Sequence, residues 1–120
     1  AKVYLLGLTF KENCPDTRNS KAFQIARSLL KYEVELSLVD PWLQEDTVPD
    51  DLKSYVVPIE AIHDADTLVI AVQHKVFQDF SLEQLSHFYK EDQHPKVLID
   101  VKGIYERPVM EQAGFLYWSL

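Results

Sequence analysis

The sequence predicts an α/β protein with a Rossmann-like, three-layer α/β/α architecture around a largely parallel sheet of about five or six strands. Short apolar runs alternate along the whole chain with segments of helical periodicity, the order expected when helices cover both faces of a parallel sheet. Several of these runs are continuously apolar, as is typical of strands buried on both faces. The 120 residues are enough for one domain and too few for two ordinary ones.

The first strand is predicted at residues 2–9, where an apolar run opens the chain. A helix over 21–32 follows, because Ala22, Ile25, Ala26, Leu29 and Leu30 recur with helical spacing. The next strand, 35–39, ends at Asp40-Pro41, since proline cannot donate to a strand ladder.

The polar stretch 42–53 is expected to be a loop with at most one helical turn, before a short strand at 55–57. Pro58 suits the first position of a short helix, 58–63. Residues 67–72 are the most apolar segment and are therefore predicted to form a central strand. A helical turn is expected near 76–80.

Ser81 is a good N-cap for a helix over 82–89. A strand at 96–101 follows, and then a short helix at 108–113 that ends at Gly114. The last predicted strand is 115–118. Trp118 and the tyrosines are expected in the core or at an interface.

Composition excludes several classes of function. A net charge of −7 argues against a general nucleic-acid surface or an anionic-membrane surface. The single cysteine, Cys14, excludes an intrachain disulfide, and no apolar run approaches the roughly 20 residues of a membrane-spanning helix. The chain lacks a visible signal peptide and enters a strand at once without a starting Met, so we expect one domain of a longer protein.

The loop from Gly7 to Ser20 lies between the first strand and the first helix, where α/β proteins bind ligands. A dinucleotide fingerprint needs two further glycines, but Thr9 and Glu12 occupy those positions. We therefore expect no NAD binding through this loop. Only three glycines occur in the chain, so another glycine-rich phosphate cradle is not expected.

The same loop offers fixed side-chain charges instead. Lys11 could reach a phosphate or a sugar hydroxyl, and Arg18 could bind a phosphate or pair with Asp16 to brace the loop. We favour the bracing role for Asp16 and Arg18. Lys102, just beyond Asp100 at the end of another strand, is the second candidate for ligand contact.

Structural roles are favoured for the other polar candidates. Cys14 precedes a proline and has no neighbouring histidine in the sequence, and the histidines show no metal-ligand spacing. His74 ends the central strand and is interpreted as structural. Asp40 stands where ribose-binding acids often lie, but without the glycine motif it is interpreted as a strand cap.

Four segments stand in the chain in a characteristic order: Gly7-Leu-Thr-Phe-Lys-Glu-Asn-Cys-Pro-Asp-Thr-Arg-Asn-Ser20, Val39-Asp40-Pro41, Ala65 to His74 followed by Phe77, and Leu98-Ile-Asp-Val-Lys-Gly103. Together they resemble the C-terminal, UDP-binding domain of the UDP-glucose/GDP-mannose 6-dehydrogenase family. The form of the first and last segments is more similar to the branch that acts on UDP-N-acetylhexosamines than to the UDP-glucose branch.

The resemblance implies an NAD-dependent enzyme that oxidises the C6 hydroxyl of a UDP-hexose or UDP-N-acetylhexosamine to the uronate, for polysaccharide precursor synthesis. Residues 1–120 would be its C-terminal nucleotide-sugar-binding domain. A Phe-Lys pair contacts the substrate in this family, which gives Phe10 and Lys11 that role. An arginine that also contacts substrate in the UDP-glucose branch corresponds to Lys102, which keeps the charge but loses the bidentate fork.

The resemblance also implies that the chemistry lies outside this chain. The family's catalytic thiol belongs to a glycine-rich segment elsewhere, so Cys14 is not that residue. We expect no catalytic residue, no metal ligand and no cofactor held by this domain alone, and no turnover by the isolated chain. Expected partners are the nucleotide sugar and the missing NAD and central dimerisation domains, without nucleic acid or membrane, in a cytoplasmic protein that is a homodimer or larger.

Two other functions stay open on the residues alone, a receiver-like interaction module and a stand-alone nucleotide-binding regulator. A receiver needs an acidic pair after the first strand and an acidic acceptor after a middle strand. Leu8-Thr9 and Gln73-His74 stand at these positions, which argues against it. A gene with an upstream glycine-rich domain would favour the dehydrogenase, and a gene encoding only these residues would favour the regulator.

Overall fold

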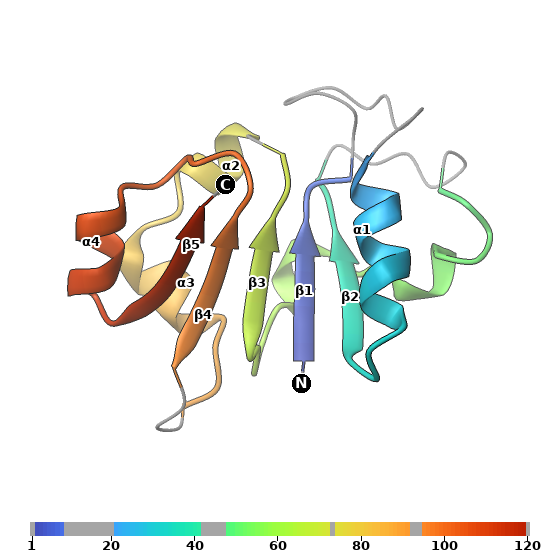
Figure 1. Cartoon of the computed structure of the whole chain (residues 1–120), viewed down its shortest axis with the longest axis horizontal. Coiled ribbons are helices and arrows are strands. Elements are labelled where there is room, and N and C mark those ends of the chain that lie inside the picture. Colours follow the sequence, from blue (N-terminus) through green and yellow to red (C-terminus); the bar gives the residue numbers. More distant parts are fainter. Residues whose placement is uncertain (1, 9–20, 42–47, 73, 92–94, 120) are drawn as a thin grey trace.

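The sheet has five strands, and every neighbouring pair is parallel. The computed structural model describes residues 2–8, 21–41, 48–72, 74–91 and 95–119. The spatial order is β2-β1-β3-β4-β5 (Figure 1), which confirms the predicted α/β class. The strands are β1 (Lys2–Leu6), β2 (Glu35–Val39), β3 (Thr67–Ile70), β4 (Lys96–Asp100) and β5 (Phe115–Ser119).

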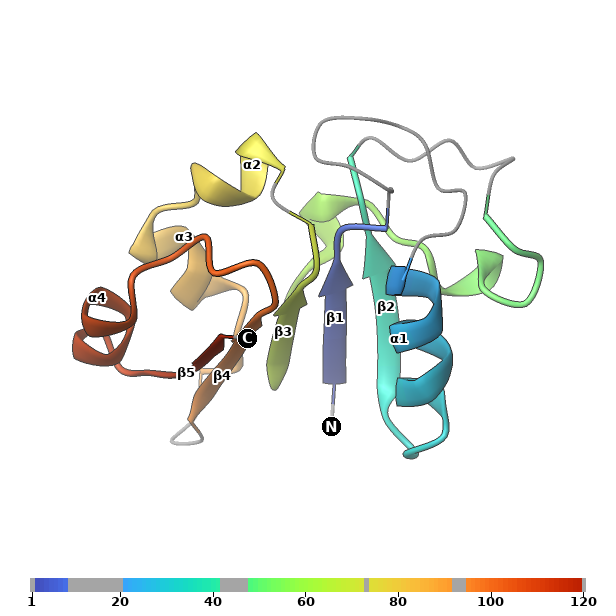
Figure 2. The same ribbon diagram turned by 45° about the horizontal axis from the view of Figure 1, so that its top comes forward.

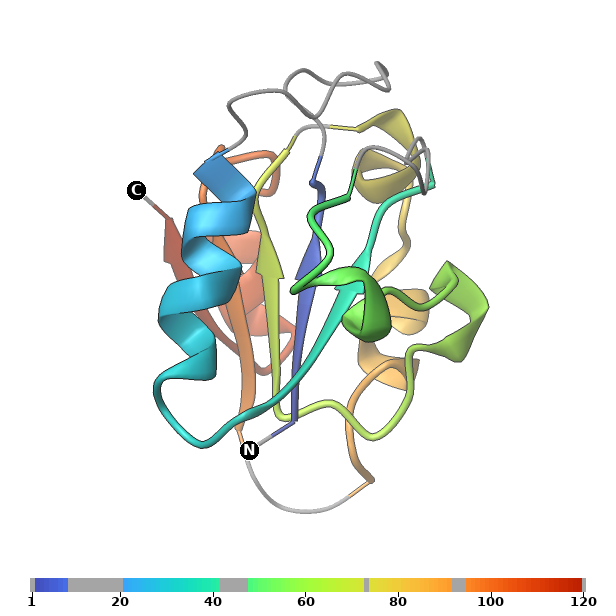
Figure 3. The ribbon, with the colours of Figure 1, turned by 90° about the vertical axis from the view of Figure 1, so that its right-hand side faces the viewer.

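Helices connect the strands on both faces of the sheet. Parallel crossovers are right-handed, so this strand order places α1 on one face and the later helices on the other (Figure 3). Within the described part of the chain the α-helices are α1 (Lys21–Leu30), α2 (Lys75–Gln78), α3 (Leu82–His87) and α4 (Arg107–Gln112), and the 3-10 helices are η2 (Lys53–Tyr55) and η3 (Ile59–Ala61).

Local chemistry fixes where these helices begin. Ser81 caps α3 as predicted: its side chain accepts a hydrogen bond from the Gln84 amide at 3.1 Å, and the Gln84 side chain accepts one from the Ser81 amide at 2.8 Å. Pro108 stands in the first turn of α4, where a missing N–H costs nothing.

One predicted strand is wrong. Residues 55–57 make only an isolated parallel bridge, between Val56 and Leu38 of β2, with a single flanking hydrogen bond from the Val57 amide to the Leu38 carbonyl at 2.9 Å. Tyr55 instead completes η2, and Pro58, which lacks an N–H, comes directly after Val57. The apolar triplet is therefore too short to extend the sheet beyond β2.

Each face of the sheet has its own buried cluster. On one face the strands pack against α2, α3 and α4 through Phe77, Leu85 and Met110, none of which is more than 1% exposed. On the other face α1 contributes Ala22, Phe23 and Ala26, while its Gln24, Arg27 and Ser28 are exposed. The predicted helical spacing therefore identified the buried side of α1.

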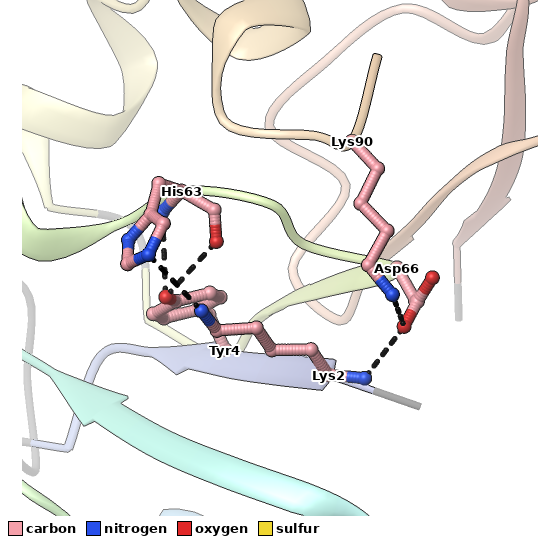
Figure 4. A network of polar contacts seen from close by, with 5 residues as sticks. All are labelled: Lys2, Tyr4, His63, Asp66 and Lys90. Carbon is pink, nitrogen blue, oxygen red and sulfur yellow. Dashed lines mark hydrogen bonds and ion pairs between the residues drawn. The ribbon is translucent and has the colours of Figure 1, made fainter. Parts of the chain in front are cut away.

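A polar network ties the first strand to the amino end of β3 (Figure 4). The Asp66 carboxylate accepts hydrogen bonds from the backbone N–H of Lys2 at 2.7 Å and from the Lys90 ammonium at 3.0 Å. The Tyr4 hydroxyl lies 3.2 Å from the His63 carbonyl. The Lys2 amide and, next, the Lys90 side chain lower the pKa of Asp66. This network lies at the amino ends of the strands, opposite the edge formed by their carboxyl ends.

We expect Asp66→Asn to lower the free energy of unfolding at neutral pH by about 1 kcal/mol, because a charge-assisted acceptor is lost. The pKa of Asp66 is lower in the folded state than in the unfolded state, so its stabilisation is present above the unfolded pKa and disappears as pH falls through the folded pKa. Urea titrations at several pH values should show the two proteins converging in acid. A difference that stays constant down to pH values below both pKa values would contradict this assignment.

Candidate functional site

The carboxyl ends of the five parallel strands lie at one edge of the sheet (Figure 2). Strand order reverses between β1 and β3, because the chain moves from β1 to β2 in one direction and then returns past β1 to β3. Open α/β sheets bind ligands at such a point. The described residues that lie there are Gly7 and Leu8 after β1 and Val72 and His74 after β3.

Gly7 is required here for close packing. Its φ is +98°, and a Cβ on this residue would lie 2.8 Å from both Cβ and the backbone N of Val72. The glycine therefore lets the residues that follow β1 and β3 approach each other closely. Leu8 follows with its side chain fully buried.

Asp40 and His74 form a buried pair at the same edge. The Asp40 Oδ2 lies 3.0 Å from Nε2 of His74, and both side chains are 0% exposed. The same oxygen accepts a hydrogen bond from the Leu8 amide at 2.6 Å. Because this carboxylate points inward, it is not presented to a ribose. The sequence favours a structural role for both residues, but nothing in it indicates that they contact each other.

His74 is also the residue that immediately precedes α2. Its carbonyl accepts hydrogen bonds from the amides of Phe77 and Gln78 at 3.0 and 3.2 Å, and its ring meets the Phe77 ring edge-on at 5.3 Å between centroids. One carboxylate thus connects the segments that leave β1, β2 and β3. It fixes the point from which the chain enters the Gly7–Ser20 loop.

A second buried carboxylate shapes the turn after β4. Asp100 is 0% exposed and accepts hydrogen bonds from the amides of Gly103 at 2.8 Å and Tyr105 at 2.9 Å. The Tyr117 hydroxyl donates to it at 2.6 Å. This arrangement folds residues 101–105 back toward the strand end, and it leaves Lys102 exposed at the carboxyl edge.

The two tyrosines around Asp100 are held in their neutral forms. Burial raises the pKa of Tyr105, and burial together with the hydrogen bond to Asp100 raises the pKa of Tyr117. The Tyr105 hydroxyl donates to the Phe77 carbonyl, which links this turn to α2. Lys102 therefore lies on a turn that several hydrogen bonds hold in place.

Of the predicted site residues, the structure places only Lys102, at the expected edge. The others lie outside the described residues: Phe10, Lys11, Asp16 and Arg18, and with them Cys14. The supporting role of Asp100 was missed. A strand-ending aspartate with a glycine three residues later is a turn signal that could have indicated it.

The described residues contain neither a metal-binding cluster nor a membrane-spanning helix. They contain no group of three or more His, Cys, Asp or Glu side chains that could hold a metal ion. Their helices are all too short or too polar to cross a membrane.

Comparison with known proteins gives a family match over most of the chain. Residues 4–107 match the model of the UDP-glucose/GDP-mannose dehydrogenase family, UDP binding domain. The matched region includes the carboxyl ends of β1 to β4, and with them Gly7, Asp40, His74, Asp100 and Lys102.

Individual relatives agree with that match. The chain is 37% identical over 109 residues to UDP-N-acetyl-D-glucosamine 6-dehydrogenase of Pseudomonas aeruginosa, covering 88% of this chain and 24% of that protein. It is 29% identical over 119 residues to UDP-N-acetyl-D-mannosamine dehydrogenase of Methanocaldococcus jannaschii, covering 99% and 26%. Both relatives are named for UDP-N-acetylhexosamines, so the predicted resemblance to that branch is confirmed.

A solved structure supports the fold. The NDP-N-acetyl-D-galactosaminuronic acid dehydrogenase of Methanosarcina mazei Go1 superposes with a TM-score of 0.80 at 22% identity, covering 99% of this chain and 24% of that one. The chain therefore spans about a quarter of the length of the proteins that it matches.

Proposed function

Since the chain belongs to the UDP-glucose/GDP-mannose dehydrogenase family, as its UDP binding domain, we propose that it binds the nucleotide sugar in a longer, NAD-dependent 6-dehydrogenase. The substrate is a UDP-hexose or UDP-N-acetylhexosamine, and its C6 hydroxyl is oxidised to the uronate. The 37% identity to a UDP-N-acetyl-D-glucosamine 6-dehydrogenase favours the N-acetylated substrates.

The observation that supports this function most directly is the setting of Lys102. A cation is exposed at the carboxyl edge, on a turn held by three hydrogen bonds to the buried Asp100. An exposed ammonium group suits the negative charge of a diphosphate or the hydroxyls of a sugar. We propose that Phe10 and Lys11, from the loop after Leu8, complete the contact.

This domain orients the substrate and does not hold the cofactor. In the complete enzyme NAD would supply the oxidising power, because conversion of the C6 alcohol to a carboxylate removes four electrons and so needs two NAD as hydride acceptors. The described residues at the ends of β1 and β2 do not fit it, because Val72 packs against Gly7 and Asp40 is committed to Leu8 and His74. The chain's own contribution is to position the nucleotide sugar and to exclude water from it, both of which raise rates without transferring a proton.

We expect Lys102→Ala in the complete protein to weaken binding of a UDP-N-acetylhexosamine about tenfold, because one charge-assisted contact, worth about 1.4 kcal/mol, is lost. Calorimetry with the nucleotide sugar and steady-state NAD reduction measure the effect. Lys102→Arg keeps the charge and should retain most of the affinity.

Lys53→Ala is the matched control, because Lys53 is also an exposed lysine and its ammonium group pairs with the Asp50 carboxylate at 3.1 Å. If Lys102→Ala behaved like this control, Lys102 would not contact the substrate. If the complete protein reduced no NAD with any UDP-sugar, the proposed function itself would be wrong.

A further inference from the structure

The sheet face that carries α1 is only half covered by the described residues. Helix α1 lies in front of β2, and Figure 1 shows no other helix in front of β4 and β5. The side chains that β4 and β5 present on this face are all apolar or aromatic. Leu116 and Trp118 are 47% and 57% exposed, and Val97 and Ile99 are partly exposed.

These four side chains form one continuous surface. Val97 pairs with Leu116 and Ile99 pairs with Trp118 in the β4–β5 register, so the two pairs lie side by side on the same face. Ile99 also pairs with Val69 of β3, which is 5% exposed and belongs to the cluster under α1. The open surface therefore continues a buried core instead of standing alone.

The apolar residues on the opposite face of the same two strands are buried. Leu98, Phe115 and Tyr117 alternate with the exposed residues along the chain and are at most 4% exposed. A strand with one face in water normally alternates apolar and polar residues, whereas continuous apolar runs belong to strands buried on both faces. The sequence of β4 and β5 is of the second kind, so it is built for a cover on both sides.

We propose that Val97, Ile99, Leu116 and Trp118 form a docking surface for an amphipathic helix of the same polypeptide, from outside these 120 residues. This surface is separate from the carboxyl edge, and the inference rests on the proposal that the chain is one domain of a longer enzyme. The matched relatives are about four times as long as this chain, so ample polypeptide is available to supply the helix.

The shape of the face favours a helix as the occupant. Parallel sheets are covered by helices, and α1 already covers the β2 half of this face. The β4–β5 half offers the remaining place beside it, where a second helix can lie next to α1 on the same sheet. An apolar stripe on that helix would remove Leu116 and Trp118 from water.

A second copy of the chain fits this surface less well. A facing copy would bring its own α1 toward β4 and β5, and the outward side of α1 carries the polar residues Gln24, Arg27 and Ser28. Arg27 is already paired with Asp51 at 3.0 Å. Each copy also carries a net charge of −7, which opposes self-association.

Cysteine labelling in the complete protein tests this proposal. Leu116→Cys and Val109→Cys place a thiol at two apolar positions of similar exposure in this structure, 47% and 43%. Val109 lies on α4, which packs against the opposite face. Maleimide modification is followed at each site by mass spectrometry and divided by the rate in urea. The cysteine at 116 should react at least tenfold more slowly than the one at 109.

Two results would overturn the proposal. Equal relative rates at the two positions would mean that the face is open to water. Protection at position 116 that disappears on dilution would identify a second copy as the occupant. The measurement contains no nucleotide sugar, so it is independent of whether Lys102 binds one.

A photo-cross-linker at position 118 provides a second test. It should form cross-links to peptides of the same polypeptide outside residues 1–120. A cross-link to residues 1–120 of another copy would contradict the proposal.

Discussion

Replacing Gly7 with alanine is expected to lower the free energy of unfolding by about 2–5 kcal/mol, in two separable parts. An L-residue at a φ of +98° is strained, which costs about 1–2 kcal/mol. The new Cβ would also lie 2.8 Å from the backbone N of Val72, which cannot rotate away, and such overpacking typically costs about 1–3 kcal/mol. Urea denaturation measures the sum.

Gly114→Ala separates the two parts. Gly114 has a similar φ, +94°, but a Cβ there would meet nothing within 4 Å. This variant should therefore show only the backbone cost. If the two alanine variants were destabilised equally, the contact between Gly7 and Val72 would contribute nothing, and the explanation of the tight approach of β1 to β3 would be wrong.

Replacing Asp40 with alanine is expected to cost about 3–5 kcal/mol, because it breaks a fully buried pair and removes the acceptor of the Leu8 amide. Asp40→Asn should cost less, since its amide oxygen can still accept the Leu8 hydrogen bond. The free energy of unfolding of both variants, measured by chemical denaturation, gives the comparison.

Asp40→Ala is also expected to affect the Gly7–Ser20 loop, which carries the proposed substrate contacts Phe10 and Lys11. Leu8 is the last described residue before Phe10 and Lys11, so releasing its amide from Asp40 frees the point at which the loop begins. Asp40→Ala should therefore bind the nucleotide sugar more weakly, because the Leu8 hydrogen bond is lost. Asp40→Asn should largely retain the affinity for the nucleotide sugar. If the alanine and asparagine variants had the same stability, the carboxylate would not be the anchor described here.

The fold could be predicted from the sequence because its signals are local. Continuous apolar runs marked the five strands, and Ser81 and Pro108 marked helix starts. The exception is instructive: residues 55–57 have strand-like composition, but whether a triplet joins a sheet depends on neighbours distant in sequence, and only Val56 found one. Local pattern does not contain that information.

The candidate site was predictable only in part, for the same reason. The position of Lys102 followed from its place after a strand. The contact between Asp40 and His74 joins residues 34 positions apart, and the grip of Tyr117 on Asp100 joins residues 17 apart. Neither pairing leaves a periodic signal. Phe10, Lys11, Asp16 and Arg18 stay predictions.

The strand order has a consequence for how the domain forms. Among the five strands of this domain β1 is synthesised first, yet it lies inside the sheet, and its partners β2 and β3 lie at very different distances along the chain. Residues 2–6 can pair with 35–39 early, but Val3 to Leu6 must wait for Thr67 to Ile70. Closing that longer loop has an additional entropic cost and slows folding. During synthesis one hydrogen-bonding edge of β1 therefore stays open, exposed to wrong strand partners, until more than half of the domain has been made.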